Sequence, residues 1–147
     1  MRAFFLLGAA LLVGGCEALP ERVSQRFATP TPQERVIEAP QAEVFEAVQQ
    51  ALTRLNYQVT RAAQAQGIVN GQSRLLPTER FGSSDQYVLE VRLRELDGEA
   101  TSVSAVLYEQ SEGQFQAGAT STPVREHGRY ESFFEVLGQV LTEPAAD

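Results

Sequence analysis

The single cysteine, Cys16, follows two glycines at the end of an apolar segment. The first two residues include an arginine, and residues 3–13 carry no charge. A helix of that length rises about 16 Å, which is too short for a hydrocarbon core of about 30 Å. A positive start, a short apolar core and small residues before a cleavage point are typical of a secretory signal peptide. The sequence therefore predicts a signal peptide over residues 1–15, cleaved between Gly15 and Cys16.

The segment Val13-Gly14-Gly15-Cys16 resembles the lipobox of bacterial lipoproteins, with valine where leucine is commonest. In that family the cysteine thiol is acylated with diacylglycerol, the signal is cut before it, and the new amino end is acylated. Several acyl chains anchor a protein stably, whereas one chain gives marginal binding. The resemblance implies lipidation of Cys16. The alternative is a buried core cysteine on an ordinary apolar segment.

Glu17 follows the cysteine that the resemblance marks for acylation. In the sorting rule of enterobacterial lipoproteins, an aspartate at this place retains the protein in the inner membrane. Glu17 therefore implies the outer membrane, with the chain on its periplasmic side. The periplasmic side of the inner membrane is the alternative.

Composition limits the remaining chemistry. After cleavage the chain would have 147 − 15 = 132 residues, enough for one domain. Its formal charge without the leader arginine would be 11 − 19 = −8, which disfavours nucleic acid and anionic lipid surfaces as partners. Lysine is absent, which excludes Schiff-base lysine chemistry and a Walker-type phosphate loop. With Cys16 acylated, no thiol remains for a disulfide, a metal or a nucleophile.

His127 is the only histidine, and it precedes the last predicted helix in a polar segment. A zinc site needs three or four suitable ligands, and with no free cysteine this chain cannot build a usual one, so we expect no metal and no cofactor. A Ser–His–acid triad is formally open, but no Gly-x-Ser-x-Gly motif accompanies the histidine. We interpret His127 as a solvated loop or helix-cap residue, and the protein as a non-enzyme.

Other candidate chemistry is weak. Glu90, Glu95, Asp97 and Glu99 are near in sequence and offer paired carboxylates for acid–base work, but they flank a predicted hairpin turn. We interpret them as solubilising surface charge. Gly67 and Gly71 flank a predicted strand, yet no helix and no lysine follow them as a phosphate-binding loop would need.

Two arginine-rich surfaces are candidates for partner contact. The first is a loop carrying Arg74, Arg80 and Phe81, because arginine and aromatic residues are enriched at interface hot spots. The alternative is that the aromatic ring fixes the loop to the domain. The second combines Arg125, His127 and Arg129, where positive charge at a helix start is unfavourable and favours an acidic neighbour. Here we favour screening by the chain's own acids, Glu126 and Glu131.

These residues need a framework, and the chain predicts one domain. Residues 16–33 are polar and rich in proline, so we expect a flexible tether that carries the lipid. Residues 34–143 form the predicted folded domain, and 144–147 a tail. Alternation predicts strands at 35–38, 57–60, 67–71, 86–95, 101–107 and, more weakly, 115–119; helical periodicity predicts helices at 41–55 and 128–141.

Local signals predict the connections. We expect Pro40 in the first turn of the first helix and Asn56, in the left-handed region, at its end. Asp97-Gly98 predicts a two-residue hairpin turn, and Glu112-Gly113 a second turn. The segment 73–85 is expected to be a long mobile loop. Gly138 beside the apolar stripe of the last helix suggests a close approach to the sheet.

The expected fold is α+β, with an antiparallel curved sheet of about four to six strands and two helices on one face, in the order β-α-β-β-β-β-α. The segments "APQAEVFEAVQQALTRLNYQVTRAAQAQGIVNGQ" and "RYESFFEVLGQVL" resemble small periplasmic lipoprotein domains of Gram-negative bacteria with unassigned function. They are also loosely similar to the helix-grip domains of the C subunit of the β-barrel assembly machinery. This resemblance implies location and fold type, and no functional residue.

The sequence thus predicts a lipid-anchored envelope lipoprotein that acts as a non-catalytic binding or assembly module, with an envelope protein as its partner. The alternative is a protein that binds a small apolar or lipid-like ligand in a groove between helices and sheet. That alternative requires the groove to be free of Phe45, Leu89, Phe133 and Phe134.

Overall fold

The structure is a computed structural model that describes residues 30–77, 83–113, 120–125 and 127–143. Among these residues the chain forms one strand, one helix, six strands and a final helix, in that order. A short 3₁₀ helix at Gln64–Gln66 lies between the first two of the six strands. The strands and the two longer helices are β1 (Gln33–Ile37), α2 (Gln41–Arg54), β2 (Gln58–Ala63), β3 (Ile68–Gln72), β4 (Leu76–Pro77), β5 (Ser83–Glu95), β6 (Thr101–Gly113), β7 (Thr120–Val124) and α3 (Gly128–Thr142).

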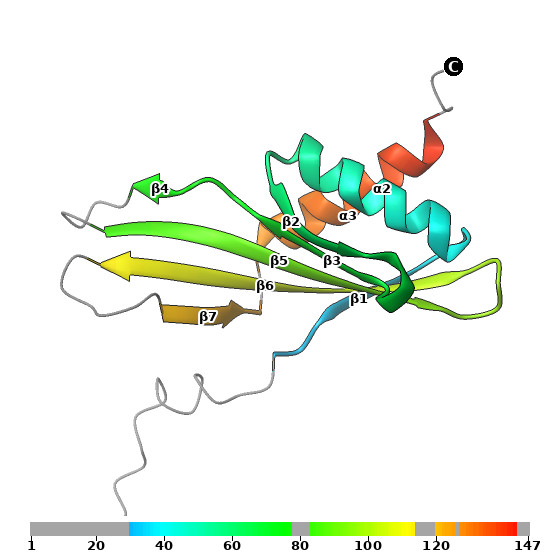
Figure 1. The fold of residues 1–147 in the computed structure, drawn as a ribbon, viewed down its shortest axis with the longest axis horizontal. Helices are drawn as coiled ribbons and strands as arrows, with labels where there is room; N and C mark the ends of the chain where they lie inside the picture. The colour runs from blue at the N-terminus through cyan, green and yellow to red at the C-terminus, as the bar shows by residue number, and fades with distance from the viewer. Residues whose placement is uncertain (1–29, 78–82, 114–119, 126, 144–147) are drawn as a thin grey trace, which may run out of the picture.

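The seven strands form one antiparallel sheet in the order β1-β6-β5-β3-β2, with β4 beside β5 and β7 beside β6. Helices α2 and α3 lie together on one face of this curved sheet (Figure 1). The predicted fold class is therefore confirmed. The sheet has one strand more than the expected range, and neither β4 nor β7 lies at a predicted strand position. In the part of the chain that the structure describes, no helix is long and apolar enough to cross a membrane.

The long hairpin β5–β6 forms the centre of the sheet. Residues 83–95 pair with 101–113 without a break in register. Alternate side chains point toward the helices and are buried, because the pleat places every second residue on one face. These are Leu89, Val91 and Leu93 on β5 and Thr101, Val103, Ala105 and Leu107 on β6.

The hairpin connection differs from the prediction. The chain between β5 and β6 runs from Leu96 to Ala100, and the Leu96 N–H donates to the Ala100 carbonyl over 2.9 Å. Gly98 has a φ of 76°, whereas Asp97 keeps a negative φ. A two-residue type I′ turn needs positive φ at both central residues. The predicted two-residue turn is therefore wrong, and a longer loop closes the hairpin.

Both helices bury one apolar stripe against the sheet. Helix α2 buries Val44, Phe45, Ala47, Val48, Ala51 and Leu52, and α3 buries Tyr130, Phe133, Phe134, Leu137 and Val140. Helix α2 ends as predicted, since Asn56 has a φ of 61°. Pro40, however, stands at the N-cap and not within the first turn. Its carbonyl accepts from the Val44 N–H over 3.1 Å.

Close backbone approach occurs at glycines other than the predicted one. Apart from its chain neighbours and the backbone of α3 itself, no atom lies within 4 Å of the position that a Cβ on Gly138 would take, so the predicted contact with the sheet is wrong. A Cβ on Gly71 would lie 2.9 Å from Leu52 Cδ2, because α2 packs directly on β3. Gly67 has a φ of +61°, and its Cβ would lie 2.2 Å from the Leu93 carbonyl oxygen.

Two predicted loop regions contain strand. The segment 73–85, expected as a long loop, includes β4 and the first residues of β5. Glu112 and Gly113, expected as a turn, belong to β6 and pair with Ser84 and Ser83. In both cases the segment forms backbone hydrogen bonds with a neighbouring strand, β5 or β6, and local turn signals do not reveal that pairing. The predicted strand at 115–119 lies outside the described residues, and β7 follows it.

Candidate functional site

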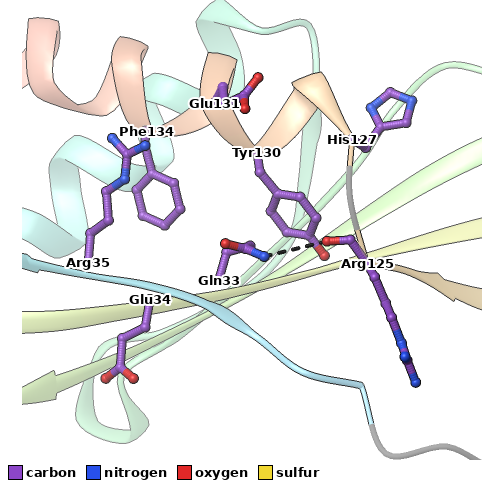
Figure 2. Close-up of a pocket in the computed structure, with 8 residues that line it drawn as sticks. All are labelled: Gln33, Glu34, Arg35, Arg125, His127, Tyr130, Glu131 and Phe134. Carbon is purple, nitrogen blue, oxygen red and sulfur yellow. Dashed lines mark hydrogen bonds between the residues drawn. The ribbon is translucent and has the colours of Figure 1, made fainter.

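A groove of about 310 Å³ lies between β1 and the start of α3 (Figure 2). Three of its lining residues are consecutive on β1, two come from the connection between β7 and α3, and three from the first turns of α3. They are Gln33, Glu34, Arg35, Arg125, His127, Tyr130, Glu131 and Phe134. Segments about ninety residues apart in sequence therefore meet here.

The groove exists because β1 and β7 share one edge of β6. Strand β1 pairs with residues 101–105 of β6, and β7 pairs with 107–111, so the two strands follow one another along that edge. Gln33 Nε2 donates to the Arg125 carbonyl over 3.4 Å and bridges the junction (Figure 2).

Tyr130 closes the inner side of this junction. Its hydroxyl accepts from the Leu107 N–H over 2.7 Å and donates to the Val124 carbonyl over 2.8 Å. The phenol thus links β6 to the end of β7. Burial raises the pKa of Tyr130, while the hydrogen bond from the Leu107 backbone acts in the opposite direction. The hydroxyl is fully used, so we assign Tyr130 a structural role.

Arg35 is the main charged group of the groove. Its guanidinium lies 4.6 Å from the centre of the Phe134 ring, a cation–π arrangement. Figure 2 draws no hydrogen bond from the Arg35 guanidinium to another residue that lines the groove, so its N–H donors are available there. Among the described residues, no carboxylate forms an ion pair with Arg35.

Glu34 is directed away from that charge. Its side chain lies on the opposite side of β1 from Arg35 (Figure 2). There it accepts a hydrogen bond from the Ser102 hydroxyl and lies 4.0 Å from a guanidinium nitrogen of Arg94. The alternation of β1 therefore separates its two charges between the two faces of the sheet.

The second predicted partner surface, Arg125, His127 and Arg129, does not form a single cluster in the structure. Arg125 and His127 lie at the rim of the groove, and Arg125 extends outward from it (Figure 2). Arg129 is not part of the lining and lies with its guanidinium 4.2 Å from the centre of the Tyr87 ring. Of the two acids proposed to screen this cluster, Glu131 lines the groove and Glu126 lies outside the described residues.

His127 is the N-cap of α3, as one of our interpretations has it. Its Nδ1 accepts from the Arg129 N–H over 3.1 Å, and its imidazole lies 5.6 Å from the Tyr87 ring. An N-cap acceptor satisfies one of the helix's unpaired N–H groups.

The first predicted surface is only partly described. Arg74 is exposed between β3 and β4, and its carbonyl accepts from the Ser73 hydroxyl over 2.9 Å. Arg80 and Phe81 lie outside the described residues, as do Gly15 and Cys16. The acids around the hairpin, Glu95, Asp97 and Glu99, are exposed. Across the described ranges, no three His, Cys, Asp or Glu side chains gather closely enough to hold a metal ion.

Sequence reasoning missed five groove residues as members of one site: Gln33, Glu34, Arg35, Tyr130 and Phe134. Arg35 alternates with Ile37 on the helix-facing side of a short strand, and a charge at such a position was the available signal. Nothing local indicates that Phe134 would provide the opposing ring.

The space between helices and sheet is occupied by side chains. Phe45, Leu89, Phe133 and Phe134 are all at least 94% buried, in one continuous core. A second surface hollow, of about 380 Å³, lies beside α2 and is lined by Gln49, Gln50, Thr53, Arg54 and Val59.

No protein-family model and no curated protein sequence matches this chain. Among solved structures, the chain is similar to the adenylate sensor from AMP-activated protein kinase, with a TM-score of 0.45 and 14% identity over 75% of this chain and 95% of that one. It is also similar to a DUF4468 family protein from Bacteroides ovatus, with a TM-score of 0.44 and 9% identity over 80% and 90% of the two chains. A TBP-like protein from Parabacteroides distasonis gives a TM-score of 0.42 and 9% identity over 80% and 95%. At these scores the likenesses imply nothing about function.

Proposed function

We propose that this chain is a cell-envelope lipoprotein, anchored through an acylated Cys16, whose folded domain binds another envelope protein without catalysing a reaction. The anchor holds the domain on the periplasmic side of the outer membrane, with the inner membrane as the alternative. The observation that carries the proposal is the groove between β1 and α3, which presents Arg35 beside an aromatic ring.

The position of the groove supports a role for a tethered domain. Gln33, which lines it, is the first residue of β1 and the last residue of the predicted tether. A partner held there would therefore lie next to the chain that leads to the lipid. A short connection raises the effective concentration of the domain near partners in the same membrane.

The chemistry of the groove favours an acidic partner group. Arg35 has free N–H donors and an aromatic support, and Arg125 and His127 lie at the rim. The chain as a whole is acidic, with a formal charge of −7 for its 147 residues. A local cationic site on an acidic protein directs an acidic segment to one place and repels it elsewhere.

A partner protein is better supported than a small apolar ligand. The interior is filled by Phe45, Leu89, Phe133 and Phe134, which occupy the space that such a ligand needs. The groove itself is open and lined largely by polar side chains. We therefore place the binding event on the surface.

The anchor is tested by mass spectrometry of the native protein and by a pair of variants. The mature amino end should be Cys16 with a diacylglycerol thioether and an amide-linked acyl chain. A Cys16→Ser variant should leave the membrane fraction. Glu17→Asp keeps the charge and the cysteine, so in an enterobacterial host it should stay membrane-bound but move to the inner membrane. A native chain that begins at Met1 would contradict the proposal.

The partner site is tested by charge reversal. Arg35→Glu should remove a cross-linked complex recovered from native membranes, whereas Arg92→Glu, an equal reversal at an exposed position on β5, should leave it unchanged. Equal loss in both variants would show that only general charge matters, and a complex that survives both would place the partner elsewhere.

A further inference from the structure

The described part of the sheet has four strands at its edges, and three of them carry features that block pairing. Strand β4 contains Pro77 and β7 contains Pro123, each of which lacks an N–H donor. Strand β2 has a register irregularity between Val59 and Arg61. Prolines and bulges are common devices that protect sheet edges from added strands.

Strand β1 carries neither device. It has no proline, and its register with β6 is regular from Gln33 to Ile37. Within the described ranges β1 pairs with β6 alone, so its outer edge is open. Four of its five residues are exposed, and Val36 retains 59% of its accessible surface. An exposed β-branched residue on an open edge is favourable for an added strand.

The charges on β1 do not block this edge. The Arg35 guanidinium is held over the Phe134 ring on the helix side, and Glu34 accepts from Ser102 on the other side. Both side chains are thus directed to the faces of the sheet and not along its edge.

We infer that the partner binds as an extended segment that adds to the sheet along the free edge of β1, with acidic side chains at alternate positions facing Arg35 and Gln33. This inference rests on the proposed function and specifies its mode of binding. In such strand addition the backbone supplies affinity, and alternate side chains supply specificity. The residues between the acids would face the same side as Val36, where an apolar or β-branched side chain fits.

A second copy of this chain is a poor occupant of the edge. If two β1 strands paired antiparallel and centred on Glu34 or Arg35, identical charges would lie directly opposite each other. Centring on Val36 would bring Glu34 opposite Glu38. Like charges at directly opposed positions destabilise a strand pair. The sequence of β1 therefore favours a different chain with acidic residues.

The specificity is tested with displayed random heptapeptides, selected on the full-length acylated protein in detergent micelles. Enriched peptides should carry acids at every second position and should bind Arg35→Glu at least about tenfold more weakly. Arg92→Glu, exposed on β5, serves as the matched control and should bind them as the wild type does. Enrichment without alternating acids, or no enrichment at all, would overturn the inference.

The binding mode is tested by amide hydrogen exchange with a selected peptide bound. Backbone N–H groups of β1 that exchange quickly in the free protein should slow at least about tenfold, while those of β2 stay unchanged. A peptide that depends on Arg35 but leaves β1 unprotected would overturn strand addition and leave the groove proposal standing. Peptide-independent dimers abolished by Val36→Asp would assign the edge to a second copy instead.

Discussion

Helix α3 has two surroundings that differ sharply. In its middle, Phe133 and Leu137 have no exposed surface and belong to the continuous core. On its groove side, the buried Phe134 ring lies beneath the Arg35 guanidinium, and at its start His127 and Glu131 border an open groove. The first environment contributes stability and has no free donors, whereas the second retains unpaired donors. Helix α3 thus contributes to both the hydrophobic core and the groove that we propose binds a partner.

The largest effect is expected in the middle of α3. Phe133→Ala would remove a fully buried ring and leave a cavity, at a cost of about 3–5 kcal/mol in the free energy of unfolding. Urea denaturation followed by circular dichroism measures this change. Glu135→Ala, at an exposed position on the same helix, should change stability by less than about 0.5 kcal/mol. Similar losses in the two variants would contradict a division of α3 into core and surface.

A smaller effect is expected where core and groove meet. Tyr130→Phe would leave the Leu107 N–H without its acceptor, which costs about 1–3 kcal/mol for a buried donor. Tyr57→Phe is the matched control, because the buried Tyr57 hydroxyl lies near the Arg129 guanidinium but meets the hydrogen-bond criteria with no described residue. Its removal should be close to neutral. If both variants lost the same stability, the bridging role of Tyr130 would be wrong.

Alkaline pH probes the same two tyrosines. Burial is the main cause that raises the pKa of Tyr57 and of Tyr130, so the folded state favours their neutral forms. Stability from this source is fully present below the unfolded pKa of about 10 and is lost as pH rises above it. Denaturation midpoints should stay level from pH 7 to about 9 and then fall. A midpoint in Tyr57→Phe that fell as steeply as in the wild type would show that Tyr57 contributes nothing.

The smallest change in stability is expected in the groove. Arg35→Ala removes one exposed cation–π contact, worth about 0.5–1 kcal/mol, and should leave the fold intact. Partner binding should nevertheless be lost, because Arg35 provides the free donors. Thermal unfolding and complex recovery from membranes measure the two properties separately. If Arg35→Ala still bound the partner, Arg35 would serve only to pack against Phe134, and the proposed binding role would be wrong.

The helical stripes and the alternation of the central hairpin could be predicted from sequence because each depends on local periodicity. Asn56 likewise ends α2 as its residue type indicates. The glycine contacts could not be predicted in the same way. Gly71 is required because Leu52 approaches β3, and only the packed structure brings those two residues together.

The groove was beyond sequence reasoning for a related reason. It depends on β1 and β7 lying along the same edge of β6, and no local pattern in either strand encodes that neighbourhood. The predicted cluster of Arg125, His127 and Arg129 contained two rim residues. It also included Arg129, which lies over Tyr87 and outside the groove. The lipidation of Cys16 stays a prediction from the leader segment.

The most direct test of the groove as a partner site is site-specific photo-crosslinking in intact cells. A benzophenone amino acid is placed at residue 33 on β1 or at residue 46, which is exposed on α2. We predict one discrete protein adduct from residue 33, none from residue 46, and loss of the adduct when Arg35→Glu is added. Equal adducts from both positions, or an adduct from residue 46 alone, would contradict the assignment of this groove as the binding surface.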